Sequence, residues 1–189
     1  ARARFIFKHA LIQDAAYDSM LKGDRIAHHR RIALALEARF PALLAEQPEL
    51  VAHHCTAGQF WDKAMGLWLA AGALALRRNA HVEAVAHLRS ALAALAELPE
   101  SPQRALQELE IQLTLGTALV AAKGYASPDL KQTFARAHRL CDLVGEVPQR
   151  IPALFGLWMY HCVGAHHPQA FELASEIVQL ADALGSDDL

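Results

Sequence analysis

GALALRRNAHVEAVAHLRSA, the sequence of residues 72–91, carries the strongest fold signal in the chain. Small residues occur in it at Gly72, Ala84 and Ala91, and the large residue Leu88 lies between the last two. In two antiparallel helices, small residues allow a close approach and large residues fill the remaining gaps. Such a pair buries its apolar face only by stacking on neighbouring pairs. The stretch therefore predicts a scaffold of stacked helix hairpins, which binds other molecules without transforming them.

The composition is typical of a soluble protein from a reducing compartment. The 189 residues suffice for one large domain or two small ones. Hydrophobic residues make up 53% of the chain, but charges interrupt them, and no run of about 18 apolar residues could span a membrane. The three cysteines are odd in number and widely spaced, which indicates reduced thiols. We therefore expect a cytoplasmic protein, and the opening ARARFIF, without Met, is typical of an excised fragment.

The charge is unevenly distributed along the chain. The net charge of −2 argues against a general nucleic-acid-binding protein. Residues 1–40, however, contain eight Lys or Arg against four acidic residues. The N-terminal part therefore differs in character from the remainder. We expect a junction segment over residues 1–47 and a region of helical repeats over residues 48–189.

Helix start and stop signals recur between stretches of apolar residues at helical spacing. Ser101 and Ser127 each precede a proline, as expected of N-caps, and Asn79 is expected to cap another helix. Glycines at positions 23, 58, 124 and 145 are expected to end helices. Residues 5–7 have strand propensity and are interpreted as a lone edge strand. The predicted helices cover approximately residues 9–21, 24–40, 48–57, 60–78, 80–98, 102–123, 128–144, 148–163 and 168 onward, with residues 41–47 as a connector.

An internal period sets the fold class. Gly72, Gly116 and Gly156 each precede a set of apolar helix positions, at intervals of roughly 40 residues. This spacing is similar to that of tetratricopeptide repeats, with somewhat longer helices. The sequence thus predicts an all-α protein of about nine helices, arranged as a right-handed superhelical stack of antiparallel helix hairpins.

Three stretches resemble one family. They are FIFKHALIQDAAYDSML at residues 5–21, HRRIALALE at residues 29–37, and ELVAHHCTAGQFWDKAMGLWLAAGALAL at residues 49–76. They resemble the bacterial STAND-type signalling ATPases, which include predicted ATPases fused to adenylate cyclase domains and large transcriptional activators. Residues 7–17 resemble the sequence that, in that family, lies at the junction between a winged-helix segment and helical repeats. GYASPDL, at residues 124–130, is similar to a family phrase between repeats.

The resemblance implies that this chain is the sensor or scaffold arm of a larger signalling or transcriptional switch. The resemblance implies that the ATPase domain lies upstream of this chain. The chain itself has no G-x-x-x-x-G-K-[ST] phosphate-binding loop. The implied role is the binding of a protein or a small-molecule effector, with regulation of the attached ATPase. No residue of the chain is assigned to catalysis or to a cofactor.

The histidines and serines are better explained by structural roles than by metal binding or nucleophilic catalysis. The eleven histidines include adjacent pairs, but neighbouring helix positions point about 100° apart and rarely share an ion. His138 and Cys141 have a better spacing but lack further local ligands. His54 is interpreted as a packing residue. Ser101 and Ser127 are better explained as caps than as nucleophiles, so no metal site or catalytic residue is predicted.

Five residues are candidates for partner binding. Trp61, Tyr125 and Tyr160 are aromatic residues that could line the concave face of a helical stack. Arg30 and Arg31 belong to a basic cluster that contacts either phosphates or the upstream domain. The alternative function is therefore a DNA-contacting transcriptional regulator whose repeats form an oligomerisation platform. A homodimer, formed through the N-terminal strand or exposed repeat ends, also stays open.

Overall fold

The computed structural model describes residues 10–145 and 147–185, which form ten α-helices and no strand. The prediction of an all-α protein is confirmed for these residues, and the strand predicted at residues 5–7 lies outside them. None of the described helices is both long and apolar enough to cross a membrane. The helices are α1 (Ala10–Asp18), α2 (Lys22–Arg39), α3 (Ala42–Glu46), α4 (Pro48–Ala57), α5 (Trp61–Arg77), α6 (His81–Ala96), α7 (Pro102–Lys123), α8 (Pro128–Val144), α9 (Val147–Val163) and α10 (His167–Leu184).

The helix absent from the sequence prediction is α3, which lies within the expected connector at residues 41–47. Its residues, Ala, Leu and Glu, are strong helix formers. Pro41 precedes it with helical dihedral angles, φ −59° and ψ −25°. Leu43 and Leu44 pack against the main core. The prediction of a connector was wrong because a helix of five residues is too short to show periodic apolar spacing.

Two expected helix boundaries are also corrected. Gly23 lies in the first turn of α2, because α1 already ends at Asp18. Asn79 does not cap α6, since Ala80 holds that position and Asn79 adopts φ 58° in the left-handed region. Asparagine is favoured both at N-caps and in the left-handed region. The sequence alone therefore does not separate the two roles.

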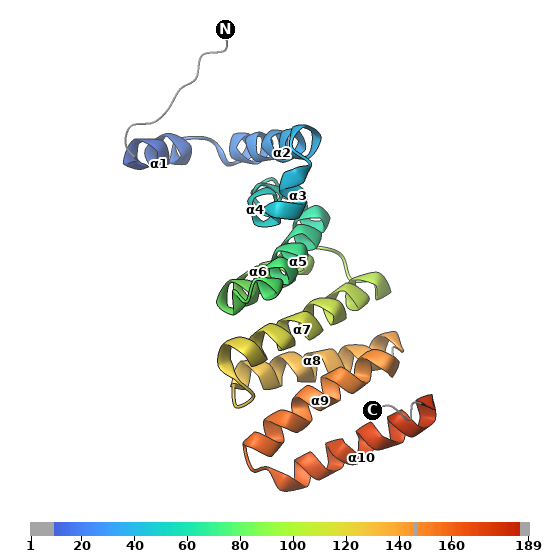
Figure 1. Ribbon diagram of the computed structural model, residues 1–189. Coiled ribbons are helices and arrows are strands. Elements are labelled where there is room, and N and C mark those ends of the chain that lie inside the picture. The colour runs from blue at the N-terminus through green and yellow to red at the C-terminus, as the bar shows by residue number, and fades with distance from the viewer. Residues whose placement is uncertain (1–9, 146, 186–189) are drawn as a thin grey trace.

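The helices from α4 to α10 are stacked in the order of the chain. Each packs against the next one, and Figure 1 shows α1 and α2 at one end of the stack and α10 at the other. The long helix α7 also contacts α5 and α9, the next helices but one along the stack on either side. The main hydrophobic core extends through the stack from Val51 in α4 to Leu157 in α9. The molecule is therefore an open stack of helices around a continuous core.

One turn geometry joins α4 to α5, α5 to α6 and α9 to α10. The middle residues Gln59, Asn79 and Ala165 have φ values of 57°, 58° and 55°. In each turn the next residue donates its backbone N–H to the carbonyl five residues earlier, at 2.8 to 2.9 Å, as in a Schellman motif. A buried alanine follows four residues after the donor in every case. The donors are Phe60, Ala80 and His166, and the alanines are Ala64, Ala84 and Ala170.

Glycines allow the helices to approach closely at three places. A Cβ atom added at Gly72 would lie 2.6 Å from Cγ of Leu88, the residue paired with it in the fold-determining stretch. A Cβ atom at Gly116 would lie 2.5 Å from Cε1 of Phe134, and one at Gly156 would lie 2.6 Å from Cγ of the same ring. The α8 residue Phe134 therefore sits between a glycine of α7 and a glycine of α9.

An ion pair adds a charged contact between α7 and α8. Arg136 donates through Nε and Nη2 to the two carboxylate oxygens of Glu108, each at 2.7 Å. These hydrogen bonds hold the pKa of Glu108 below its ordinary value of 4.5. Because the pKa is lower in the folded state, the stabilisation is fully present above pH 4.5. It is lost as the pH falls through the depressed value.

We expect Arg136→Met to lower the free energy of unfolding by about 1 kcal/mol at neutral pH. The effect is modest because the Arg136 side chain is 40% exposed and therefore screened by water. Urea unfolding at several pH values would show the loss shrinking as Glu108 becomes protonated in the parent chain. Arg89→Met is the control, since its partner Asp129 is 39% exposed, against 16% for Glu108, and keeps its ion pair with Lys123. An equal loss at all pH values would contradict this account of the pair.

Candidate binding groove

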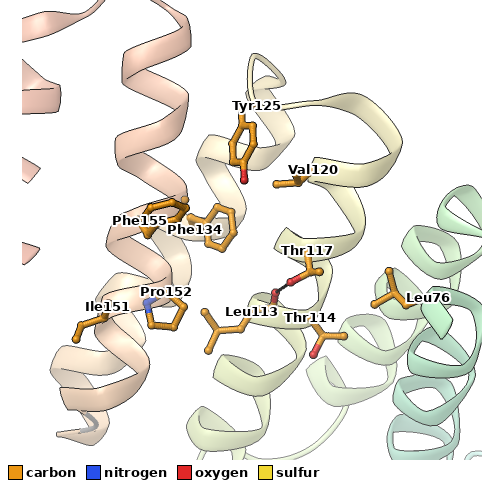
Figure 2. Close-up of a pocket in the computed structure, with 11 residues that line it drawn as sticks. Leu76, Leu113, Thr114, Thr117, Val120, Tyr125, Phe134, Ile151, Pro152 and Phe155 are labelled. Carbon is orange, nitrogen blue, oxygen red and sulfur yellow. Dashed lines mark hydrogen bonds between the residues drawn. The ribbon is translucent and has the colours of Figure 1, made fainter. Parts of the chain in front are cut away.

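An open groove of about 690 Å³ lies on one side of the stack. It lies beside α5, α7 and α9, with α8 beneath it and the turn after α7 at its edge. Figure 2 shows the lining side chains converging from these elements. The lining residues are Leu76, Leu113, Thr114, Thr117, Val120, Tyr125, Phe134, Ile151, Pro152, Phe155 and Gly156.

The groove is uncharged and mostly apolar. None of its lining residues is Asp, Glu, Lys, Arg or His. The hydroxyl of Thr114 donates to the carbonyl of Glu110 at 2.9 Å, and that of Thr117 donates to the carbonyl of Leu113 at 3.2 Å. These bonds occupy the hydroxyl protons within α7, so both threonines present methyl groups and acceptor lone pairs to the groove. The lining can therefore bind apolar surface.

Tyr125 is the predicted partner-binding residue that the structure places in the groove. Gly124 ends α7 with φ 75°, and its N–H donates to the carbonyl of Val120. A backbone turn of this kind favours glycine, and it brings Tyr125 over the end of the groove (Figure 2). The ring is half-buried and packs against the main core. Its phenol is the one aromatic hydroxyl among the lining residues.

The other two predicted aromatic residues lie elsewhere. Trp61 begins α5 and packs, half-buried, against the main core. Tyr160 in α9 stacks on His166 with an interplanar angle of 8° and lies under the ammonium group of Lys131 at 5.5 Å. Neither residue lines the groove. Their roles in partner binding therefore stay predictions without geometric support.

The two predicted arginines differ in what they contact. Arg30 donates from Nε to the carbonyl of Gly58 at 2.7 Å, and its guanidinium lies 5.2 Å from the centre of the Phe60 ring. It therefore joins α2 to the turn between α4 and α5. Arg31 is exposed and lines a shallow basic and apolar face of α2. The contacts of Arg30 favour a structural role over phosphate binding.

The described residues contain no group of three His, Cys, Asp or Glu side chains placed to hold a metal ion. Among the cysteines, Cys55 is fully buried, and burial raises the pKa of its thiol to about 11. Cys55 is thus protonated at neutral pH and is a poor nucleophile.

Sequence reasoning missed most of the groove-lining residues. Ile151 and Phe155 are separated by four positions on α9 and lie on one face of it. Leu76 in α5 and Leu113 in α7 meet them only through the stacking of alternate helices. Apolar spacing within one helix shows that such a face exists, but it does not show which face a neighbouring helix leaves open.

Comparison with known proteins adds one relative. The chain is 26% identical over 160 residues to an uncharacterized protein of Rhizobium meliloti (strain 1021). The match includes 84% of this chain and 16% of the relative, so the chain corresponds to a small part of that protein. No family model matches the chain, and no solved structure matches it.

Proposed function

We propose that the chain is a non-catalytic helical-repeat module that binds an apolar part of a protein or of a small effector in the groove beside α5, α7 and α9. The proposal includes a tetratricopeptide-like, right-handed superhelical stack. The recurrence of one turn geometry after α4, α5 and α9 supports it, because repeated hairpins produce repeated turns. The glycine contacts at positions 72, 116 and 156 support it as well.

The same proposal places the module in a larger STAND-type switch. The support is the resemblance of residues 5–21, 29–37 and 49–76 to that family. In the Rhizobium meliloti relative the matching segment is also one part of a much longer chain. A bound partner would regulate the attached ATPase by favouring one of its two conformational states. The module itself is proposed to hydrolyse no nucleotide, and measurable ATP turnover by the purified chain would contradict this.

The uncharged, apolar lining of the groove is the observation that carries the binding proposal. We expect the neutral dye Nile red to bind the purified chain, and Thr117→Glu to weaken that binding by about tenfold or more. A carboxylate in the groove must lose hydration when an apolar molecule covers it, which opposes binding. Thr117 is exposed, so the substitution leaves the core intact. Fluorescence titration of both proteins measures the change.

Ala86→Glu is the matched control. Ala86 is exposed on α6, which contributes no lining residue to the groove, and the substitution adds the same charge. The control is expected to bind the dye with the affinity of the parent chain. Equal affinities for the parent chain and both variants would show that the dye binds elsewhere and would remove the support for the groove.

A further inference from the structure

The two ends of the stack carry opposite charge. With histidine taken as neutral, α2 contains five Lys or Arg residues and two acidic residues, which gives a net charge of +3. α10 contains three acidic residues and no Lys or Arg, which gives −3. The net charges of the other described helices lie between −2 and +1. Since α2 and α10 lie toward opposite ends of the stack (Figure 1), the molecule has a basic end and an acidic end.

The exposed face of α2 combines basic and apolar side chains. It forms a shallow groove of about 560 Å³, lined by His28, Arg31, Ile32, Leu34, Ala35 and Arg39. Ile32 and Leu34 are 41% and 49% exposed. Arg31 and Arg39 are exposed as well, and none of the ion pairs between described side chains includes either of them. This face therefore offers apolar surface beside two arginines.

The outer face of α10 has the matching character. Ala170 is buried, whereas Phe171 and Val178 are 74% and 58% exposed. Phe171, Val178 and Asp182 are separated by seven and four positions, so they lie on one face of the helix. Glu172 lies beside this face, and both acidic side chains are exposed. α10 therefore offers apolar surface beside two carboxylates.

The charges on the two faces have similar spacing. Arg31 and Arg39 are eight positions apart, which corresponds to about 12 Å along a helix, and Glu172 and Asp182 are ten positions apart, or about 15 Å. In each helix an exposed apolar side chain lies between the two charges. Two such helices, packed along each other, can form both charge pairs around an apolar contact, because long arginine side chains span the difference of about 3 Å.

The two faces cannot meet within one molecule, because the helices from α4 to α9 lie between them. They can meet between two molecules, since the α10 face of one copy complements the α2 face of the next. A contact between two different faces leaves one of each unused at the ends, so it adds further copies instead of closing a symmetric pair.

We propose that this chain associates head to tail with further copies of itself, through the basic, apolar face of α2 and the acidic, apolar face of α10. A contact between one pair of helices buries less than the about 1,600 Å² of a standard interface, so the association is weak. It does not depend on the groove beside α5, α7 and α9, because no residue of either face lines that groove.

Sedimentation equilibrium of the purified chain at increasing concentration tests the contact. We expect the weight-average mass to rise from that of one chain to beyond that of two between about 10 µM and about 1 mM. Raising the salt concentration from about 0.05 M to about 0.5 M should weaken the association by about tenfold, because the charges are exposed. A monomer at every concentration, or a mass that stops at two chains, would overturn the proposal.

Phe171→Ser tests the apolar part of the contact. The side chain is 74% exposed, so the variant should fold like the parent chain. We expect it to weaken the association by about tenfold or more, because the ring is the most exposed apolar group of the α10 face. Val82→Ser is the matched control, since Val82 is 76% exposed on α6 and lies on neither face. Equal weakening by both substitutions would contradict the assignment of the α10 face.

Reversal of the charges tests the polar part. Arg31→Glu with Arg39→Glu makes both ends acidic, and we expect the association to weaken by about tenfold or more. Adding Glu172→Arg and Asp182→Arg to the same chain restores the parent net charge and exchanges the two signs. The association of this fourfold variant should return to within about threefold of the parent value. If the fourfold variant is folded by circular dichroism yet stays a monomer, the two faces do not meet.

Arg77→Glu with Arg78→Glu separates the contact from a general effect of net charge. Both arginines are exposed at the end of α5, and their reversal changes the net charge by the same amount. This variant should associate like the parent chain. A loss equal to that caused by reversal at Arg31 and Arg39 would mean that net charge alone governs the association, which would also overturn the proposal.

Discussion

Phe134→Ala is expected to lower the free energy of unfolding by about 3–5 kcal/mol, the largest loss from a single substitution at the groove. The ring is 6% exposed, and it lies between Gly116 of α7 and Gly156 of α9. Neither glycine has a side chain that could move into the space left by the ring. The cavity therefore stays open, and the adjoining helices lose their shared contact. Urea unfolding followed by circular dichroism measures the loss.

Phe155→Ala is the matched control for this substitution. Phe155 lines the same groove but is 45% exposed, so its removal uncovers little buried surface. Its expected cost is about 1 kcal/mol or less. Equal losses for the two variants would mean that Phe134 does not hold α7 and α9 together.

Gly156→Val is expected to lower the free energy of unfolding by about 3 kcal/mol, at the upper end of the usual cost of overpacking. Any side chain at this position overlaps the Phe134 ring. The ring has little room to move toward α7, because it lies so close to the backbone of Gly116 that a Cβ atom added there would overlap it. The helices must therefore separate locally. The same unfolding experiment measures the cost.

Gly66→Val provides the comparison on another helix. Gly66 lies in α5, is exposed, and has no neighbouring atom within 4 Å of an added Cβ. Valine has a better helix propensity than glycine, so we expect no loss and a small gain in stability. A loss similar to that of Gly156→Val would indicate a general intolerance of β-branched residues in these helices.

Much of the secondary structure could be predicted because its signals are local. Ser101 accepts a hydrogen bond from the Arg104 N–H at 3.1 Å, as its position before a proline predicts. Gly145 ends α8 in the left-handed conformation with φ 74°. Asn79 shows where such local prediction fails. Asparagine can either cap the start of a helix or adopt the left-handed conformation after one, and Asn79 does the second. The expected connector at residues 41–47 fails for a related reason: α3 is too short to be periodic.

The sites depend on tertiary structure, and less of them could be predicted. Tyr125 is predicted on the same grounds as Trp61 and Tyr160, as an aromatic residue that could line a concave face, and of the three it alone lines the groove. The half-buried positions of Trp61 and Tyr160 lie outside the groove, because residue type alone does not show which face of a helix stays open. His54 is predicted to be a packing residue whose hydrogen bonds are satisfied, and its partner is His29, 25 positions earlier. No local pattern indicates that pairing.

The packing of the Phe134 ring between two glycines is tested most directly by a double-mutant cycle. The change in unfolding free energy caused by Gly156→Ala is measured in the parent chain and in the Phe134→Ala variant. In the parent chain the added methyl group overlaps the ring, so the substitution should destabilise. Without the ring only the helix propensity of alanine remains, and the substitution should stabilise by up to about 1 kcal/mol. The same change in both backgrounds would contradict the proposed packing of α7, α8 and α9.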